Sequence, residues 1–290
     1  MKLINAAIRW FINLFSPALV ESIVRRRTAS ALARAEAQQW RLRILDVMAC
    51  PDNRQLSRVP HAGEVQDGFQ IMFNGIRVGA DGYYGRGMTE LLRKNRGSHE
   101  PQEEKVFQEV LRHLPPGAQM IECGAYWGFY SMWFVRDVPQ ARVWLIEPEP
   151  SNLESGRKNF TANNLEGYFI HAFVERHSAN GSPPHVCIDD FLASQHIKHL
   201  TILHADIQGM ELEMLQGATQ TLSQKLVDYI FISTHGDEVH AACVAFLRTH
   251  DYATPVSLLP AESYSFDGLI VACFPSLREN PLPALSAKTR

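Results

Sequence analysis

The sequence predicts an α/β fold: a mainly parallel sheet with helices on both faces. Apolar, strand-like segments alternate with helix-like segments between Pro101 and Phe274, and such alternation is typical of parallel sheets covered on both sides. Within this region, residues 118–131 have the pattern of a buried strand, a glycine turn and the start of a helix. The next strand-like run, Val143 to Ile146, ends at Glu147. Together these segments form one βαβ unit of the kind that binds nucleotides.

The glycine turn indicates the kind of ligand. Gly124 and Gly128 leave room for a ligand beside the backbone, and a helix that begins at Phe129 offers free N–H groups. Glu147 stands where such sites place an acid on the ribose hydroxyls. The pattern lacks the third glycine of the dinucleotide motif, which packs the helix close to a pyrophosphate. A cofactor without phosphates is therefore favoured, and S-adenosylmethionine fits better than NAD.

The order of elements follows from hydrophobic periodicity and from turn residues. We expect helices over 28–48, 101–114, 153–163, 210–222 and 238–249, strands over 118–123, 143–147, 168–174, 201–206, 228–233 and 268–274, and a short strand that enters a helix over 186–191. The predicted domain boundaries are an N-terminal helical segment at 1–48, a small β-containing lid or cap at 49–100, the nucleotide-type domain at 101–275 and a loose C-terminal tail at 276–290.

The first hundred residues carry three further signals. Residues 1–15 have apolar side chains at helical spacing, and Trp10 with Arg25, Arg26 and Arg27 allows peripheral membrane contact through residues 1–27. A helix that packs on the domain or on a second subunit, giving a homodimer, is an equal alternative. Asn74-Gly75 between two apolar runs predicts a hairpin with a type I′ turn. The glycines from Gly79 to Gly87 predict a loop, which could close over a site.

Composition limits the partners and the compartment. The net charge of -3 provides no general basic field, so we expect no nucleic-acid partner. The five cysteines are scattered and odd in number, which favours buried free thiols and a cytoplasmic protein. Membrane association of this cytoplasmic protein would depend on residues 1–27. No apolar run is long enough to span a bilayer.

Polar residues at the carboxyl ends of the predicted strands are the candidates for chemistry, because ligands bind at that edge of an open sheet. His204 and Asp206 lie two apart on one strand, and His235 follows the next strand. These three side chains could meet and remove a proton from a substrate hydroxyl, or hold a divalent metal, which we do not favour. Glu211, just after Gly209, is interpreted as a cap of its own helix.

Several motifs occur in an order and spacing that resemble those of FkbM-family methyltransferases, over about residues 101 to 274. They are Ile121-Glu122-Cys123-Gly124-Ala125-Tyr126-Trp127-Gly128, Ile146-Glu147-Pro148, Ile188-Asp189-Asp190-Phe191 and Ala205-Asp206-Ile207-Gln208-Gly209-Met210-Glu211 continuing to Ala218. The family commonly shows Lys-x-Asp-x-Glu-Gly, and this chain has His204 and Gln208 in place of the lysine and the glutamate.

The resemblance implies a class I methyltransferase (Rossmann-like) sheet of seven strands with the last one antiparallel. The implied cofactor is S-adenosylmethionine, and the usual reaction is O-methylation, often of sugar or natural-product hydroxyls. The glycine turn with Glu122 would hold the methionine part, Glu147 the ribose, and the Asp206 region would face the acceptor.

The sequence thus predicts an S-adenosylmethionine-dependent O-methyltransferase that acts on a hydroxyl of a glycan, glycolipid or secondary metabolite. A catalytically silent module for cofactor binding and assembly, and a nicotinamide oxidoreductase, are the alternatives. The expected catalytic residues are Asp206, His204 and His235. The expected cofactor contacts are Glu122, Gly124, Ala125, Tyr126, Gly128, Ser131, Glu147 and Asp190.

Overall fold

The computed structural model describes residues 17–80, 82–274 and 282–288. The amphipathic helix expected over residues 1–15, and with it most of the proposed membrane contact, lies outside these residues and stays a prediction. Contacts divide the chain into two compact units, Met1–Leu42 and Arg43–Arg290. The long helix α2 (Pro17–Ala49) makes up the described part of the first unit and continues into the second.

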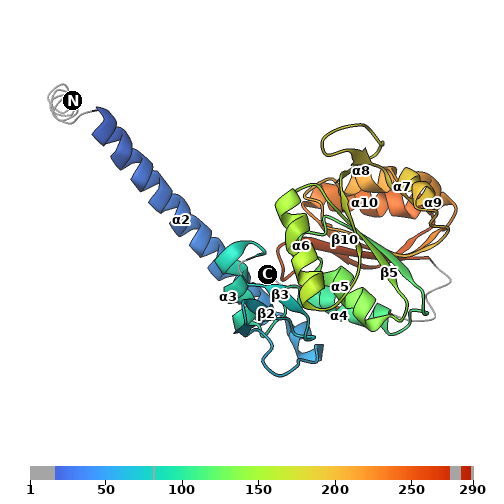
Figure 1. The fold of residues 1–290 in the computed structure, drawn as a ribbon, viewed down its shortest axis with the longest axis horizontal. Helices are drawn as coiled ribbons and strands as arrows, with labels where there is room; N and C mark the ends of the chain where they lie inside the picture. Colours follow the sequence, from blue (N-terminus) through green and yellow to red (C-terminus); the bar gives the residue numbers. More distant parts are fainter. Residues whose placement is uncertain (1–16, 81, 275–281, 289–290) are drawn as a thin grey trace. The chain divides into compact units, whose positions relative to one another are not determined.

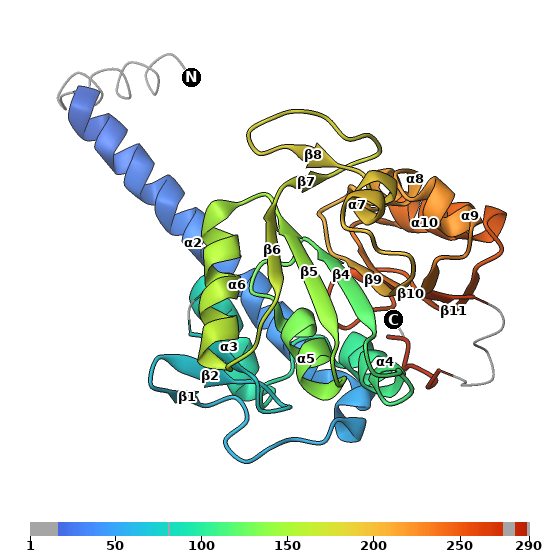
Figure 2. The same ribbon diagram turned by 45° about the vertical axis from the view of Figure 1, so that its right-hand side comes forward.

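A seven-stranded sheet forms the centre of the second unit and confirms the predicted fold class. Within the described residues, its order is β11-β12-β10-β9-β4-β5-β6, and Figure 2 shows β6, β5, β4, β9 and β10 side by side. The strands are β4 (Gln119–Cys123), β5 (Arg142–Glu147), β6 (Tyr168–His171), β9 (Leu200–Ala205), β10 (Val227–Thr234), β11 (Ala253–Leu258) and β12 (Gly268–Cys273). Among the described strands of this sheet, β12 runs antiparallel to both of its neighbours, and the other six strands run in one direction. This arrangement is that of a class I methyltransferase sheet.

Helices cover both faces of this sheet (Figure 1). They are α4 (Pro101–Leu111), α5 (Phe129–Asp137) and α6 (Pro150–Ala162) on one side, and α7 (Ile188–Ser194), α8 (Glu211–Gln216), α9 (Thr219–Ser223) and α10 (Asp237–Thr249) on the other. Strand residues alternate between the faces. Ile121 and Leu203 join the core under α7 to α10, whereas the aromatic ring of Phe231 contacts Phe107 of α4 at 5.4 Å. Both faces are buried, as the near-continuous apolar strands require.

Two elements differ from the sequence prediction. Residue-by-residue patterning gave no strand at 253–258, because Pro255 interrupts it; the structure places this segment at the sheet edge with a register shift, where proline is tolerated. The helix expected over 210–222 is two short helices, α8 and α9. The helix is interrupted at Gly217, whose carbonyl oxygen accepts a hydrogen bond from the Asp189 backbone N–H.

A smaller antiparallel sheet precedes the main one. It contains β1 (Val65–Gln66), β2 (Phe69–Ile71) and β3 (Arg77–Gly79), so the expected hairpin is confirmed. The type I′ turn is wrong: β2 and β3 pair up to Ile71 and Arg77, which leaves a five-residue loop, and Gly75 has a positive φ but Asn74 does not. The Asn74 side chain instead accepts a hydrogen bond from the Ile76 backbone, 3.2 Å away.

Asn159 of α6 and Asn163, which follows the end of that helix, attach the small sheet to the core. The backbone N–H groups of Arg77 and Gly79 donate to the side chains of Asn163 and Asn159, at 2.9 and 2.8 Å. The chain then passes through the glycine-rich segment into α3 (Gly85–Lys94), a helix that the loop prediction for Gly79 to Gly87 did not include. The attachment of the small sheet to the core thus fixes the position of Tyr83 and Tyr84, which lie between β3 and α3.

The C-terminal segment is bound rather than loose over its described residues, 282–288. The Lys105 ammonium donates to the Ala284 carbonyl at 2.6 Å and to Asp52 at 2.8 Å. The Ser286 backbone N–H donates to Asp52 at 2.9 Å, and Lys288 pairs with Asp46 at 2.7 Å. Buried and half-buried polar groups thus hold the segment in place.

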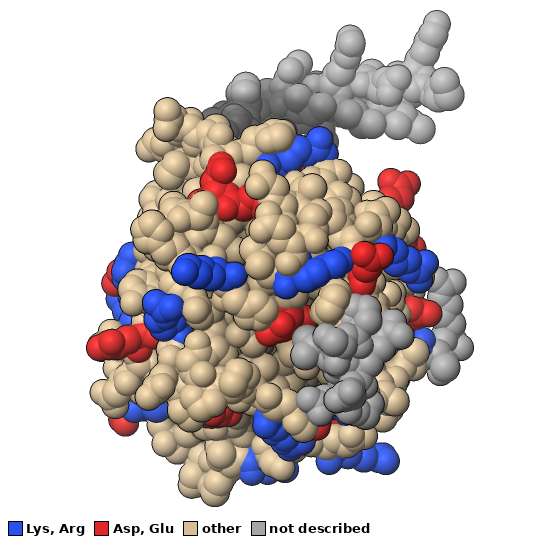
Figure 3. Space-filling view, turned by 90° about the vertical axis from the view of Figure 1, so that its right-hand side faces the viewer, with Lys and Arg blue, Asp and Glu red and all other residues tan. Residues whose placement is uncertain are grey.

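The remaining elements are η1 (Pro51–Gln55) and the short strands β7 (Phe173–Val174) and β8 (His185–Val186). All five cysteines are buried and free, as expected. Among the described helices, none combines the length and the apolarity that crossing a bilayer requires. On the face drawn in Figure 3, Lys and Arg side chains lie among Asp and Glu side chains, so that face carries no field of one sign.

The turn after β4 should be the position where a methyl group is least tolerated. A Cβ on Gly124 would stand 1.9 Å from the Asp206 carbonyl oxygen, and the φ of Gly124 is +73°. Gly117 has a similar φ of +79° with open space around it, so Gly117→Ala measures the backbone cost alone, about 1 kcal/mol. Urea unfolding should show that Gly124→Ala lowers the free energy of unfolding at least about twice as much as Gly117→Ala does. Equal decreases in the two variants would contradict the tight contact between the ends of β4 and β9.

Candidate functional site

The glycine turn between β4 and α5 is anchored on the end of the neighbouring strand β5. The backbone N–H groups of Gly124 and Ala125 both donate to the Ile146 carbonyl, at 2.9 and 3.3 Å. Tyr126 has a φ of +42°, which is unusual for a residue with a side chain. The backbone here is bent back toward β5, and the Tyr126 ring turns to the edge of the sheet where ligands bind.

Glu147 at the end of β5 is held in place by this turn. The side chain is buried, and its Oε2 accepts a hydrogen bond from the Tyr126 backbone at 3.1 Å. Its Oε1 accepts from the backbone N–H of Glu149 at 2.9 Å and from the Asn152 amide at 3.3 Å. A buried carboxylate fixed by three donors is a well-oriented acceptor for ligand hydroxyl groups.

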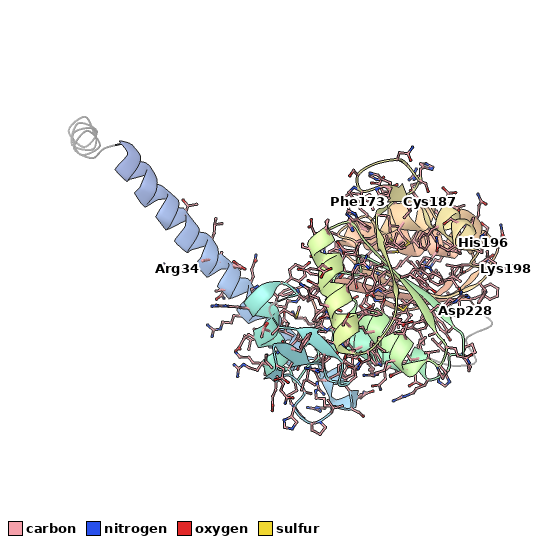
Figure 4. All side chains as sticks on the ribbon, viewed as in Figure 1. Arg34, Phe173, Cys187, His196, Lys198 and Asp228 are labelled. Atoms are coloured by element: carbon pink, nitrogen blue, oxygen red, sulfur yellow. The ribbon has the colours of Figure 1, made fainter. Side chains whose placement is uncertain are left out.

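A cleft of about 480 Å³ opens beside Glu147, a volume within the range of small-molecule sites. Its apolar lining consists of Ile146, Pro148, Ala172, Phe173, Val174, Ile207 and Met210, and its polar and aromatic lining of Tyr83, Tyr84, Gly124, Tyr126, Glu147, Asn152, Asp206 and Gln208. Phe173 comes from β7 and is labelled in Figure 4. An apolar part next to ordered polar groups suits a purine nucleoside.

A second, much smaller cavity of about 20 Å³ shares Tyr83, Gly124, Tyr126 and Asp206 with the cleft. This volume holds one water molecule or one small polar head group. Its further lining is His99, Glu100, Glu122, Ala125, Trp127, Tyr130, His204 and Ser233. Burial raises the pKa of Glu122 to about 7. Three carboxyl groups, those of Glu100, Glu122 and Asp206, and two histidines thus share this small cavity.

Tyr83 covers the junction of the two cavities. Its ring stacks on Trp127 with a centroid distance of 4.1 Å and an interplanar angle of 10°, and it also contacts Tyr126 at 4.6 Å. Tyr84 follows with its side chain half exposed and a left-handed backbone, at a φ of +47°. The loop predicted over Gly79 to Gly87 therefore carries two residues that line the site.

Asp206 and His235 meet at the mouth of the cleft, as the sequence predicts. The His235 Nε2 lies 3.4 Å from the Asp206 carboxylate and 3.6 Å from that of Asp267, and its Nδ1 lies 2.7 Å from Glu211. Burial, followed by the charge of Glu100, raises the pKa of Asp206 to about 7. A carboxyl group that titrates near neutral pH is suited to proton transfer.

His204 does not join this pair. It points from β9 toward α4, where its Nε2 lies 2.7 Å from the Glu103 carboxylate, while its Nδ1 is buried without a hydrogen-bond partner. His204 and Asp206 thus line the same small cavity, but the register beside Glu122 directs the His204 hydrogen bond to Glu103, so the three residues do not form one hydrogen-bonded group. No group of three His, Cys, Asp or Glu side chains among the described residues is arranged to hold a metal ion.

The other predicted cofactor contacts are placed as follows. Gly124, Tyr126 and Glu147 line the cleft, and Glu122 and Ala125 line the small cavity. Ser131 acts through Glu122, to which its backbone and its hydroxyl both donate. Gly128 and Asp190 line neither cavity. Gly128 packs against Leu145 and Phe160, and Asp190 is exposed on the first turn of α7, where hydrogen bonds from Ser178 and Cys187 lower its pKa.

Several residues of the site were not found by sequence reasoning. They are His99, Glu100, Asn152 and Phe173, whereas Tyr83 and Tyr84 belong to the loop that the sequence allowed to close over a site. Asn152 could have been predicted from the sequence, because it follows Glu147-Pro148 by about one helical turn. His99 and Glu100 directly precede α4 and are distant in sequence from the strand ends that form the site. No local pattern in the sequence therefore identifies them as site residues.

Comparison with solved structures finds distant likenesses. The precorrin-6y C5,15-methyltransferase of Geobacter metallireducens is 16% identical, with 58% of this chain and 84% of that chain covered and a TM-score of 0.42. A putative rRNA methylase of Clostridium thermocellum is 10% identical, with coverages of 59% and 94% and a TM-score of 0.45. TrmK of M. capricolum, solved with S-adenosyl-homocysteine, is 12% identical, with coverages of 58% and 67% and a TM-score of 0.41. Likenesses this distant say nothing of the acceptor.

Comparison with proteins of curated function gives no match. Family models give one: the methyltransferase FkbM domain, over residues 182–253. This range contains the motifs at Ile188 and Ala205, with Asp206 and His235, whereas those at Ile121 and Ile146 lie before it. The resemblance to FkbM-family methyltransferases expected from the sequence is confirmed by this match over residues 182–253.

Proposed function

We propose that the chain is an S-adenosylmethionine-dependent O-methyltransferase that acts on a hydroxyl of a small-molecule acceptor: a glycan, a glycolipid or a secondary metabolite. The observation that carries the proposal is the position of Glu147 and Asp206 on one cleft, on either side of the glycine turn. The first is a fixed acceptor for ribose hydroxyls, and the second is a carboxyl group that titrates near neutral pH.

The residues present fit this cofactor. Ile146, Ala172 and Val174 offer an apolar place for the adenine, and Glu147 a place for the ribose. The small cavity beyond Gly124 has room for no more than about one water molecule, so the methionine end would lie in the cleft beside it, with its ammonium group toward the carboxyl groups of the cavity lining. S-adenosylmethionine would supply an electrophilic methyl group to the acceptor.

This chain would contribute mainly orientation and one proton acceptor. Tyr83 and Tyr126 exclude water from the junction of the two cavities, which limits hydrolysis and strengthens nearby electrostatic interactions. Asp206 would take the proton from the acceptor hydroxyl as its oxygen becomes bonded to carbon. Holding that oxygen in line with the methyl group supplies most of the rate increase expected of such an enzyme.

Loss of the Glu147 carboxylate should weaken cofactor binding. Hydrogen bonds to a charged group contribute about 1.5–3 kcal/mol, so Glu147→Ala should bind S-adenosylmethionine and S-adenosylhomocysteine roughly 10- to 100-fold more weakly by calorimetry. Glu147→Gln retains one acceptor and should lie between this variant and the wild type. Glu154→Ala, on the exposed side of α6, is the matched control. Wild-type protein that binds NAD and neither of these ligands would favour the oxidoreductase alternative.

Asp206→Asn should stop methyl transfer but leave cofactor affinity nearly unchanged. Removing a general base typically lowers the rate by about 10²- to 10⁴-fold. In the wild type, kcat/KM should fall as the pH drops through about 7, because Asp206 becomes protonated. An Asp206→Asn variant with wild-type turnover would exclude Asp206 as the base. Cofactor binding without transfer to any acceptor in the wild type would favour the silent-module alternative.

A further inference from the structure

Glu211 is a fully buried carboxylate whose strongest contact is with a histidine. Its exposed fraction is 0%, and it lies on the first turn of α8. The Oε1 atom accepts a hydrogen bond from the Gly209 backbone at 2.9 Å and lies 2.7 Å from the His235 Nδ1. The cap of its own helix that the sequence predicts is thus only part of its role. A buried carboxylate is costly unless it is paired, and His235 is the pairing group.

The other nitrogen of the His235 ring faces the proposed proton acceptor. Nε2 lies 3.4 Å from Asp206 and 3.6 Å from Asp267, and the Gln208 amide is 3.0 Å away. The buried Asp206 Oδ1 has no hydrogen-bond partner of its own. Rotation of the His235 ring about its side-chain bonds would remove a positive charge from this position, and Glu211 prevents that rotation.

We propose that Glu211 is a positioning residue for proton removal: its carboxylate holds the His235 ring so that Nε2 faces Asp206 and Asp267. The proposal rests on the proposed function, in which Asp206 receives the acceptor proton. Glu211 itself lines neither cavity and touches no reacting atom. Its effect on the reaction passes entirely through His235.

The charges around the pair agree with this role. Burial disfavours a charged His235 ring, but the hydrogen bond to Glu211 and the charges of Asp206 and Asp267 outweigh it and raise the pKa of His235 to about 9. The ring is therefore a cation at neutral pH. Its charge opposes the effect of burial and of Glu100, which together raise the pKa of Asp206 to about 7. Without the cation, the pKa of Asp206 would be higher, and a smaller fraction of Asp206 could accept a proton at neutral pH.

The groups that face Asp206 and His235 come from several elements. They are Glu100 and Glu103 at the start of α4, the hydroxyls of Tyr83 and Tyr84, His204 on β9, Glu211 on α8, Asp267 before β12 and, facing Asp267, Arg43 on α2. Glu211 is the member of this set that bonds His235 on the side away from Asp206. Its substitution should therefore change the state of the ring without removing a group from the cleft.

Helix α8 offers a matched control. Glu213 lies two residues after Glu211, is 40% exposed and pairs with Arg176 on the surface at 3.1 Å. Glu213→Gln removes the same charge from the same helix without contact to His235. A comparison of Glu211→Gln with Glu213→Gln thus separates the specific contact from any general effect of charge on α8.

The test is a nitrogen-detected NMR titration of His235 in the wild type and both variants, with the signal assigned from His235→Gln. In Glu211→Gln the pKa of His235 should fall by about one unit or more, which is a tenfold change in proton affinity. Glu213→Gln should titrate like the wild type. The acid limb of the kcat/KM profile should move to higher pH in Glu211→Gln alone, and cofactor affinity measured by calorimetry should stay unchanged.

A folded Glu211→Gln variant whose His235 titrates like the wild type would overturn the proposal. The wild-type protein gives a second test that needs no variant: its His235 should titrate above pH 8 and show a hydrogen-bonded proton on Nδ1, and a ring that titrates near pH 6.5 would overturn the proposal as well. Wild-type protein that fails to bind S-adenosylmethionine would contradict the proposed function instead. The two failures are therefore distinguishable.

Discussion

The contact between the ends of β4, β5 and β9 is the constraint on which the site depends. The Asp206 backbone N–H donates to the Cys123 carbonyl at 3.0 Å, and the Gly124 N–H donates to the Ile146 carbonyl at 2.9 Å. The ends of these three strands can approach one another this closely only because residue 124 has no Cβ. The first consequence is geometric: a glutamate from β5 and an aspartate after β9 come to border one cleft, although 59 residues separate Glu147 and Asp206 in the sequence.

Buried charge is the second theme of the structure. Three glutamates are each paired with a histidine over a short distance: Glu103 with His204 at 2.7 Å, Glu104 with His99 at 2.8 Å and Glu211 with His235 at 2.7 Å. Such pairs offset the desolvation of each carboxylate. Burial and pairing act in opposite directions on the histidine protons, and the pKa of each of the three histidines is raised. This arrangement suits a reaction whose only proton transfer is from a hydroxyl to a carboxylate.

The parts of this account that depend on local patterns were predictable from the sequence. The strand, glycine turn and helix around Gly124 and the acid at Glu147 are defined by neighbouring residues, and their geometry agrees with the expectation. The meeting of Asp206 with His235 was also predictable, because both residues end adjacent parallel strands.

The parts that depend on long-range packing were not predictable. His204 was expected beside Asp206, yet the register against β4 directs it to Glu103, a residue 101 positions earlier in the chain. The aromatic cover from Tyr83 depends on the attachment of β3 to α6 through Asn159 and Asn163, a contact that no periodicity reveals. Asp190 was expected to contact the cofactor, but it lies on the first turn of α7 at the surface, the helix-entry position that the sequence also allowed. In each case tertiary contacts decided where a side chain of suitable chemistry points.

The most direct test of the central claim is a crystal structure of the complex with S-adenosylhomocysteine. The account predicts the ribose hydroxyls within hydrogen-bond distance of Glu147, the adenine against Ile146 and Ala172, and the sulfur atom on the Asp206 side of Gly124. A ligand bound elsewhere, or bound with its ribose away from Glu147, would contradict the account.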